Sequence, residues 1–167
     1  MEYFDLYEKW IWFGFAAVGF AILFNVPKRT LFTIFLMAAL GGTLKMLIMS
    51  WHDSVILGTF AGAVLVGFLS IWAAHSKHSP PFVFAIPSVI PMVPGAFAYR
   101  TMKGIIEITN NTDPDHFLTI LNSTVSNGFK TMFILIAISL GVSTPMLLTR
   151  RDSVKEIRIK FKKPTKK

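Results

Sequence analysis

Three prolines in an uncharged, apolar stretch are the residues of this sequence best suited to do chemistry. Pro87, Pro91 and Pro94 lie within eight residues, and Gly95 follows directly. A proline lacks the backbone N–H and clashes with the preceding helical turn, so nearby carbonyl groups lose their partners. At membrane depth, such backbone is tolerated only where protein encloses it or where it lines a watery cavity. Broken helices of this kind bind cations at freed carbonyls and anions at helix N-termini.

Basic residues follow these prolines. A new helix can begin after Gly95, and it would carry Tyr99, Arg100 and Lys103, with Glu107 four residues beyond Lys103. Two interpretations stay open. The segment is a kinked structural helix with an interfacial basic cluster in which Lys103 and Glu107 pair. Alternatively, the prolines shape a pore, and Arg100 or Lys103 attracts a carboxylate.

The last apolar stretch adds a polar stripe. Residues 117–149 could form one helix of about 50 Å, at 1.5 Å per residue. Its first part, 117–130, is a polar extension in which apolar and polar residues alternate with a helical period. Polar groups in a span face the bundle interior or a cavity. Interhelical hydrogen bonds and a cavity lining are both open for this stripe, which consists of Asn122, Ser123, Ser126, Asn127 and Lys130.

A pathway between the proline break and this stripe is therefore our hypothesis for the functional site. Its candidate residues are Pro87, Pro91, Pro94, Gly95, Tyr99, Arg100, Lys103, Asn122, Ser126, Asn127 and Lys130. Lys45 is a further cation inside an apolar stretch, which snorkelling towards the surface would explain. Lys45, Arg100, Lys103 and Lys130 are the cations that an anionic substrate would contact.

The composition indicates which elements position these residues. The chain has 167 residues, of which 53% are hydrophobic and 16% charged, against roughly 25% charged residues in a soluble domain. It therefore predicts an all-α integral membrane protein rather than a soluble enzyme, a disordered chain or a coiled coil. A spanning helix needs about 20 apolar residues. Five predicted spans meet this length, and the prolines break the fourth: residues 10–26, 31–51, 55–74, 79–99 and 131–149.

The positive charge gathers at the C-terminal end. Nine of the seventeen Lys and Arg residues lie in residues 150–167, and this tail carries +7 of the net charge of +8. A basic run directly after an apolar segment is typical of a cytoplasmic juxtamembrane end. We expect a membrane domain over residues 1–149 and a cytoplasmic tail over 150–167, with an outer N-terminus and the Lys28–Arg29 and Lys77 loops inside. No nucleic-acid motif accompanies the charge.

Other classes of site find little support. The chain has no cysteine, and His75 and His78 have no third ligand nearby, so we expect neither a metal site nor a cofactor. No HExxH or GxSxG motif is present, which argues against an enzyme. Gly58, Gly62 and Gly67 let helices approach closely, either within the protomer or between subunits.

Two motifs resemble the threonine/serine exporter family. They are Phe24–Arg29, which reads FNVPKR, and Ile90–Tyr99, which reads IPMVPGAFAY. The Leu140–Pro145 stretch and the chain length are similar to the small, YjjB-like subunit of split exporters, over roughly residues 10–150. The resemblance implies a five-helix half of a bacterial inner-membrane exporter that acts with a larger YjjP-like subunit. It also implies small-molecule substrates: threonine and serine, or dicarboxylates such as succinate. No site residue carries over, and the long basic tail departs from the family pattern.

The prediction is thus a subunit of a secondary exporter for small carboxylate-bearing metabolites, multi-pass in the lipid bilayer of a bacterial inner membrane. A structural membrane subunit that supports a partner without forming the pathway is the alternative. Association into a homo-oligomer is left open.

Overall fold

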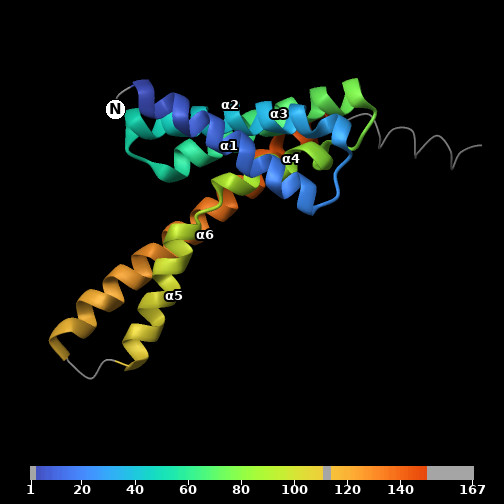
Figure 1. Ribbon diagram of the computed structural model, residues 1–167. Helices are drawn as coiled ribbons and strands as arrows, with labels where there is room; N and C mark the ends of the chain where they lie inside the picture. Colours follow the sequence, from blue (N-terminus) through green and yellow to red (C-terminus); the bar gives the residue numbers. More distant parts are fainter. Residues whose placement is uncertain (1–2, 111–113, 150–167) are drawn as a thin grey trace, which may run out of the picture.

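All secondary-structure elements in the described part of the chain are helices. The computed structural model describes residues 3–110 and 114–149, so the predicted basic tail lies outside the described residues. The elements, in order, are α1 (Tyr3–Leu23), η1 (Lys28–Thr30), α2 (Leu31–His52), α3 (Val55–Lys77), α4 (Pro81–Val89), η2 (Ile90–Met92), α5 (Gly95–Asn110) and α6 (Pro114–Thr149) (Figure 1). The all-α prediction is confirmed.

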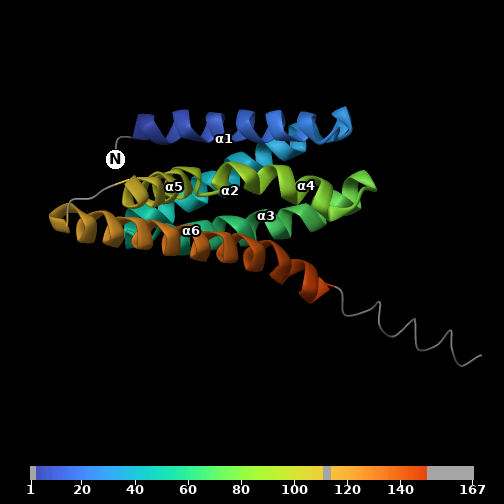
Figure 2. The ribbon, with the colours of Figure 1, turned by 90° about the horizontal axis from the view of Figure 1, so that it is seen from below.

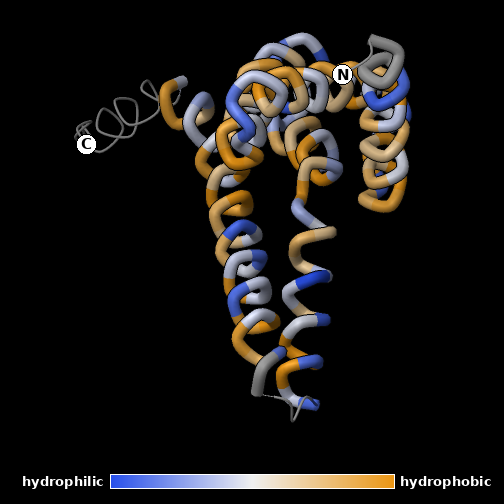
Figure 3. The backbone as a smooth tube through the Cα atoms, turned by 90° about the vertical axis from the view of Figure 1, so that its left-hand side faces the viewer, coloured by the Kyte–Doolittle hydropathy of each residue, from blue (hydrophilic) through white to orange (hydrophobic). Residues whose placement is uncertain are grey.

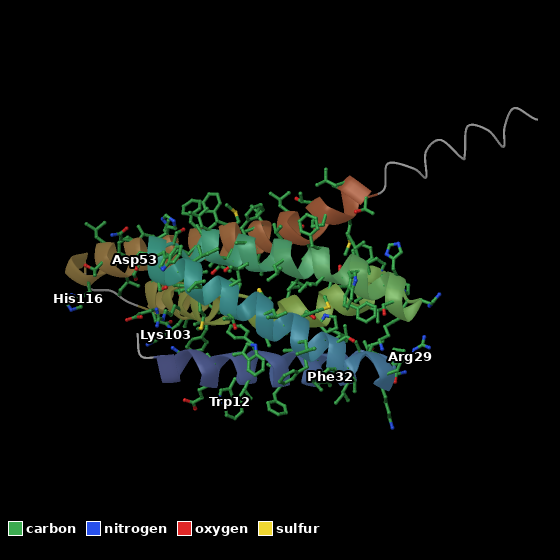
Figure 4. All side chains as sticks on the ribbon, turned by 90° about the horizontal axis from the view of Figure 1, so that it is seen from above. Trp12, Arg29, Phe32, Asp53, Lys103 and His116 are labelled. Carbon is green, nitrogen blue, oxygen red and sulfur yellow. The ribbon has the colours of Figure 1, made fainter. Side chains whose placement is uncertain are left out.

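The helices run back and forth between two ends of the molecule. Helices α1, α2 and α3 alternate in direction, and α4 and α5 together make a fourth pass (Figures 1 and 2). Figure 4 places Arg29 at one end and both Asp53 and His116 at the other. The order of the turns agrees with the predicted alternation, while the side that faces the cytoplasm stays a prediction.

Length and hydropathy identify three helical segments that could cross a membrane. They are Lys28–His52, Val55–Lys77 and His116–Thr149, and a fourth exists if Pro81–Met92 and Gly95–Asn110 count as one span bent by 55°. The predicted span 10–26 is not among them, and the helix in this region, α1, runs from Tyr3 to Leu23. Asn25, with a φ of 55°, ends the helix in a left-handed turn. The number of five spans therefore stays a prediction.

Small residues bring the central helices close together. A Cβ placed on Gly62 in α3 would lie 2.6 Å from the carbonyl oxygen of Gly41 in α2. A Cβ on Gly58 would lie 2.6 Å from the carbonyl oxygen of Lys45, and one on Gly141 in α6 would lie 2.7 Å from Ala63 Cβ. These glycines thus pack helices within one protomer, which was the first of the two interpretations of their spacing.

The core is small and the apolar outer surface is large. Ala38, Ala63, Val66 and Phe84 are among the fully buried core residues. Large hydrophobic side chains such as Trp12 and Phe32 remain exposed on the outside (Figure 4). Extended exposed apolar surface marks contact with lipid or with another protein, as the membrane prediction requires.

Helices α5 and α6 form a hairpin that projects from the bundle. The first half of α6 runs beside α5, whereas its second half packs against α3 (Figures 1 and 3). The predicted single helix over 117–149 is confirmed within α6, which extends from Pro114 to Thr149. One continuous helix therefore belongs to both parts of the molecule.

Candidate functional site

The predicted break lies between α4 and α5. A 3-10 turn over Ile90–Met92 ends α4, and α5 begins at Gly95 after a bend of 55°. Val93 N donates to the Ile90 carbonyl at 3.0 Å, and Gly95 N donates to the Val93 carbonyl at 2.9 Å. Pro94 has no N–H to give. The N–H groups of Val93 and Gly95 are therefore already hydrogen-bonded within the break, and Pro94 offers none.

Pro87 does not take part in this break, and in that respect the prediction was wrong. It lies inside α4, fully buried, and the helix continues to Val89. A proline in the seventh position of a nine-residue helix removes only one intrahelical hydrogen bond, and buried packing holds the turn. Pro91 and Pro94 therefore make the bend without it.

Lys45 of α2 supplies the donor that the break lacks. Its Nζ donates a hydrogen bond of 3.0 Å to the Met92 carbonyl oxygen, across 47 residues of sequence. Met92 is fully buried, and its side chain fits against bare glycine: a Cβ on Gly41 would lie 2.7 Å from Met92 Cε. An amine inside an apolar helix pair thus meets a carbonyl that the break has freed.

Lys130 of α6 meets the other side of the break. Its Nζ lies 5.8 Å from the centre of the Phe97 ring in the first turn of α5, a cation–π contact. Lys45 and Lys130 thus contact residues on the two sides of Pro94, Met92 before it and Phe97 after it. The pathway itself stays a prediction.

The remaining polar candidates lie on the outer side of the hairpin. Helix α5 packs on α6 through Thr101 and Gly104, which meet Gly128 and Thr124. Steps of 100° per residue place Arg100 and Lys103 on one flank of α5, and Asn122, Ser126 and Lys130 on the stripe of α6 that is turned largely away from α5. Neither set lies in the contact between the two helices, so both belong to the outer side of the hairpin.

This side, which we call the polar hairpin face, is not enclosed within the described residues. The face comprises Arg100, Lys103, Glu107, Asn122, Ser126 and Lys130, all of which are exposed. Tyr99, at 71% exposure, lies on α5 next to the apolar flank. Asn127 is half-buried in the helix contact and donates to the Ser123 carbonyl of its own helix at 2.8 Å. Gly95 is exposed at the start of α5.

Comparison with known proteins assigns the family. Residues 9–148 match the model of the threonine/serine exporter family, ThrE. The chain belongs to the threonine/serine exporter family. An uncharacterized protein of Haemophilus influenzae is 33% identical to it over 136 residues, which cover 81% of this chain and 45% of the relative. The chain thus spans less than half of that relative's length, and no solved structure matches it.

Two cavities of this exporter-family chain lie away from the polar hairpin face. One of about 370 Å³ lies between α3, α4 and α6, and its lining includes His75, Phe82, Ser143 and Met146. The other, of about 330 Å³, lies between α4 and the turn after α1, and Pro87 is part of its wall. Both are mainly apolar, and neither is lined by the polar pathway candidates.

Sequence reasoning left Lys45 out of the pathway of this exporter-family protein. The signal that could have included it is its position as the one charge of an otherwise uncharged predicted span, 31–51, since intramembrane cations usually have a partner. Snorkelling does not describe it, because its amine reaches the Met92 carbonyl instead. The described residues also hold no group of three possible metal ligands.

Proposed function

We propose that this chain is a subunit of a secondary exporter that carries small carboxylate-bearing metabolites out of a bacterial cell across its inner membrane. The proposed substrates are threonine- or serine-type amino acids and dicarboxylates such as succinate. Its membership of the threonine/serine exporter family supports the transport role. The observation that carries the site is the bent α4–α5 pass, where Lys45 bonds the break and Lys130 lies over the Phe97 ring in the first turn of α5.

The charges at the break favour a carboxylate. Lys45 contacts the break itself, Lys130 contacts the Phe97 ring in the first turn of α5, and Arg100 and Lys103 continue the positive charge along the polar hairpin face. A guanidinium binds a carboxylate through two parallel hydrogen bonds. The N-terminus of α5, at Gly95, adds the positive end of a helix dipole. Glu107 is the one acidic residue on that face.

A second subunit would enclose the polar hairpin face. Charged side chains exposed to lipid cost free energy, so this face needs a polar partner or a watery pathway beside it. In the Haemophilus influenzae relative, the matched region is less than half of the protein. We propose that a larger YjjP-like membrane subunit covers the face, with the C-terminal tail of this chain in the cytoplasm.

Flux measurements in proteoliposomes test the proposal. The chain and its co-purifying partner are reconstituted alone and together, and efflux of labelled threonine and succinate is followed. We expect transport only from the pair. Arg100→Gln and Lys130→Gln should each lower it by about 10-fold or more, since each removes a charge-assisted hydrogen bond, and Pro91→Ala should lower it by relaxing the bend.

Lys77→Gln is the matched control, because Lys77 lies in the last turn of α3, away from the break. Unchanged flux in well-expressed Arg100 and Lys130 variants would remove the pathway from this face.

The structural alternative keeps one observation in its favour, namely that neither of the two cavities described above is lined by the polar candidates. Full transport by the partner alone would establish that alternative.

A further inference from the structure

Lys45 is a charge without a described counter-ion. It is the fifteenth of the 22 residues of α2, seven residues before the helix ends at His52. The carboxylates whose side chains the structure describes are Glu8 of α1, Asp53 in the α2–α3 turn and Glu107 of the hairpin, and none forms an ion pair with Lys45. An ammonium in apolar surroundings must find hydrogen-bond acceptors. Within the described residues it has one, the Met92 carbonyl.

This acceptor exists because the pass is bent. In a continuous helix the Met92 carbonyl would accept from the N–H four residues further on. In the bent chain, the N–H groups of Val93 and Gly95 bond within the break, and Pro94 has none. Straightening of α4 and α5 would return the Met92 carbonyl to a backbone donor. The Lys45–Met92 hydrogen bond therefore stabilises the bent form alone.

The surroundings hold the lysine in this position. A Cβ on Gly62 would lie 3.4 Å from Lys45 Cβ and 3.3 Å from Met92 Sδ, so the lysine stem and Met92 both lie against bare backbone of α3. Gly58 likewise lies against the Lys45 backbone. Among the described residues, no other charged residue lies in this contact between α2 and α3. To leave the Met92 carbonyl, the ammonium therefore needs another hydrogen-bond acceptor.

We propose that the substrate carboxylate is that other acceptor: Lys45 holds the break bent while it binds the Met92 carbonyl, and an arriving carboxylate takes the ammonium and permits the pass to straighten. Lys45 is then both an anion-binding residue and the one that couples binding to a change of shape. The identity of the anion rests on the proposed function, whereas the role of the hydrogen bond in the bend does not.

Distance measurements between two labels test this inference directly. The chain contains no cysteine, so two exposed positions can carry spin labels: Ser50→Cys near the end of α2, as the reference, and Thr109→Cys near the end of α5, on the arm that follows the bend. The full-length chain is studied in nanodiscs of phosphatidylethanolamine and phosphatidylglycerol. We expect Lys45→Met to change the ratio of bent to straight forms by about 10- to 100-fold, the effect of losing one hydrogen bond to a charged group.

Lys45→Arg should keep the wild-type distances, because it retains a cationic donor, and Lys77→Met serves as the matched lysine control. Lys45→Gln, which keeps a neutral donor, replaces Lys45→Met if that variant does not fold. Succinate or threonine, but not chloride, should shift the wild type in the same direction as Lys45→Met and should leave Lys45→Met unchanged.

Two results would overturn the inference: the same distances in Lys45→Met and wild type, or an equal response of both to succinate and threonine. The transport assay separates its failure from that of the proposed function. If Lys45→Met exports normally, the proposed exporter function stands and the role of Lys45 is rejected. If Lys45→Met changes the label distances but the chain and its partner export neither threonine nor succinate, the role of the hydrogen bond stands and the proposed substrates are rejected.

Discussion

The α2–α3 contact and the α5–α6 hairpin are both built on glycine, yet they differ in what meets it. Between α2 and α3, the atoms that a Cβ on Gly58 or Gly62 would meet first are backbone carbonyl oxygens, at 2.6 Å. In the hairpin, a Cβ on Gly104 or Gly128 would meet the side chains of Thr124 and Thr101. Backbone cannot move aside, whereas a side chain can rotate. The first contact is therefore rigid and the second adaptable.

Burial shows the same contrast. Helix α3 buries eight of its residues, whereas Gly104 is the one buried residue of α5. Much of the hairpin surface is thus left for something else to cover. The difference indicates that α2 and α3 form a fixed frame against which the hairpin can change its position.

The largest effect is expected from Gly62→Ala in the fixed frame. The new methyl group would lie 2.6 Å from the Gly41 carbonyl oxygen, and overpacking of this kind costs about 1–3 kcal/mol or more. We expect a clear loss of thermal stability and of folded protein in detergent. Gly19→Ala is the matched control, because nothing lies within 4 Å of its Cβ position. Equal melting of the two variants would contradict the rigid contact.

A smaller and local effect is expected from Gly104→Ala in the hairpin. Its methyl group would collide with Thr124 Oγ1, which now donates to the Ile120 carbonyl at 2.7 Å. Rotation of Thr124 relieves the collision at the cost of that hydrogen bond, about 0.5–1.5 kcal/mol. Spin labels on α5 and α6 should report wider separation while the melting of the bundle stays near wild type. Thr124→Ala in the Gly104→Ala background removes the colliding hydroxyl and should restore part of the contact. Cooperative unfolding of the whole bundle would contradict the difference between the two regions.

The smallest effect is expected from Lys130→Met at the base of the hairpin. It removes the cation from the Phe97 ring, a contact worth about 0.5–1 kcal/mol at an exposed site. Amide hydrogen exchange in the first turn of α5 should become about 2- to 5-fold faster. Lys130→Arg, which keeps a cation over the ring, should exchange as the wild type does. Faster exchange in α2 as well would show that the two regions are not separate.

Local chemistry made much of the fold predictable. Proline spacing located the bend, because a missing N–H acts on its own helix. The helical period of Asn122, Ser126 and Lys130 predicted an amphipathic first half of α6. Both predictions depend only on residues a few positions apart in the sequence. The structure places Pro91 in the 3-10 turn at the bend and the polar residues in α6, as expected.

Contacts between distant parts of the chain were not predictable in the same way. The Lys45–Met92 hydrogen bond joins residues 47 apart, and no pattern in either segment names the other. Pro87 was assigned to the break because it lies within eight residues of Pro91 and Pro94. Burial of α4 against its neighbours nevertheless preserves the helix at Pro87. Tertiary packing decided both cases.

The continuity of α6 has a mechanical consequence. About 40 Å of helix lies between Pro114 and Gly141, where α6 touches Ala63 of α3, and about 12 Å remains from there to Thr149. The shorter stretch is held against α3, where Pro145 meets Gly67. The longer stretch is a lever: a rotation of about 10° around Gly141 would carry the hairpin tip about 7 Å. A small tilt at the α3–α6 contact is thereby enlarged at the tip of the hairpin.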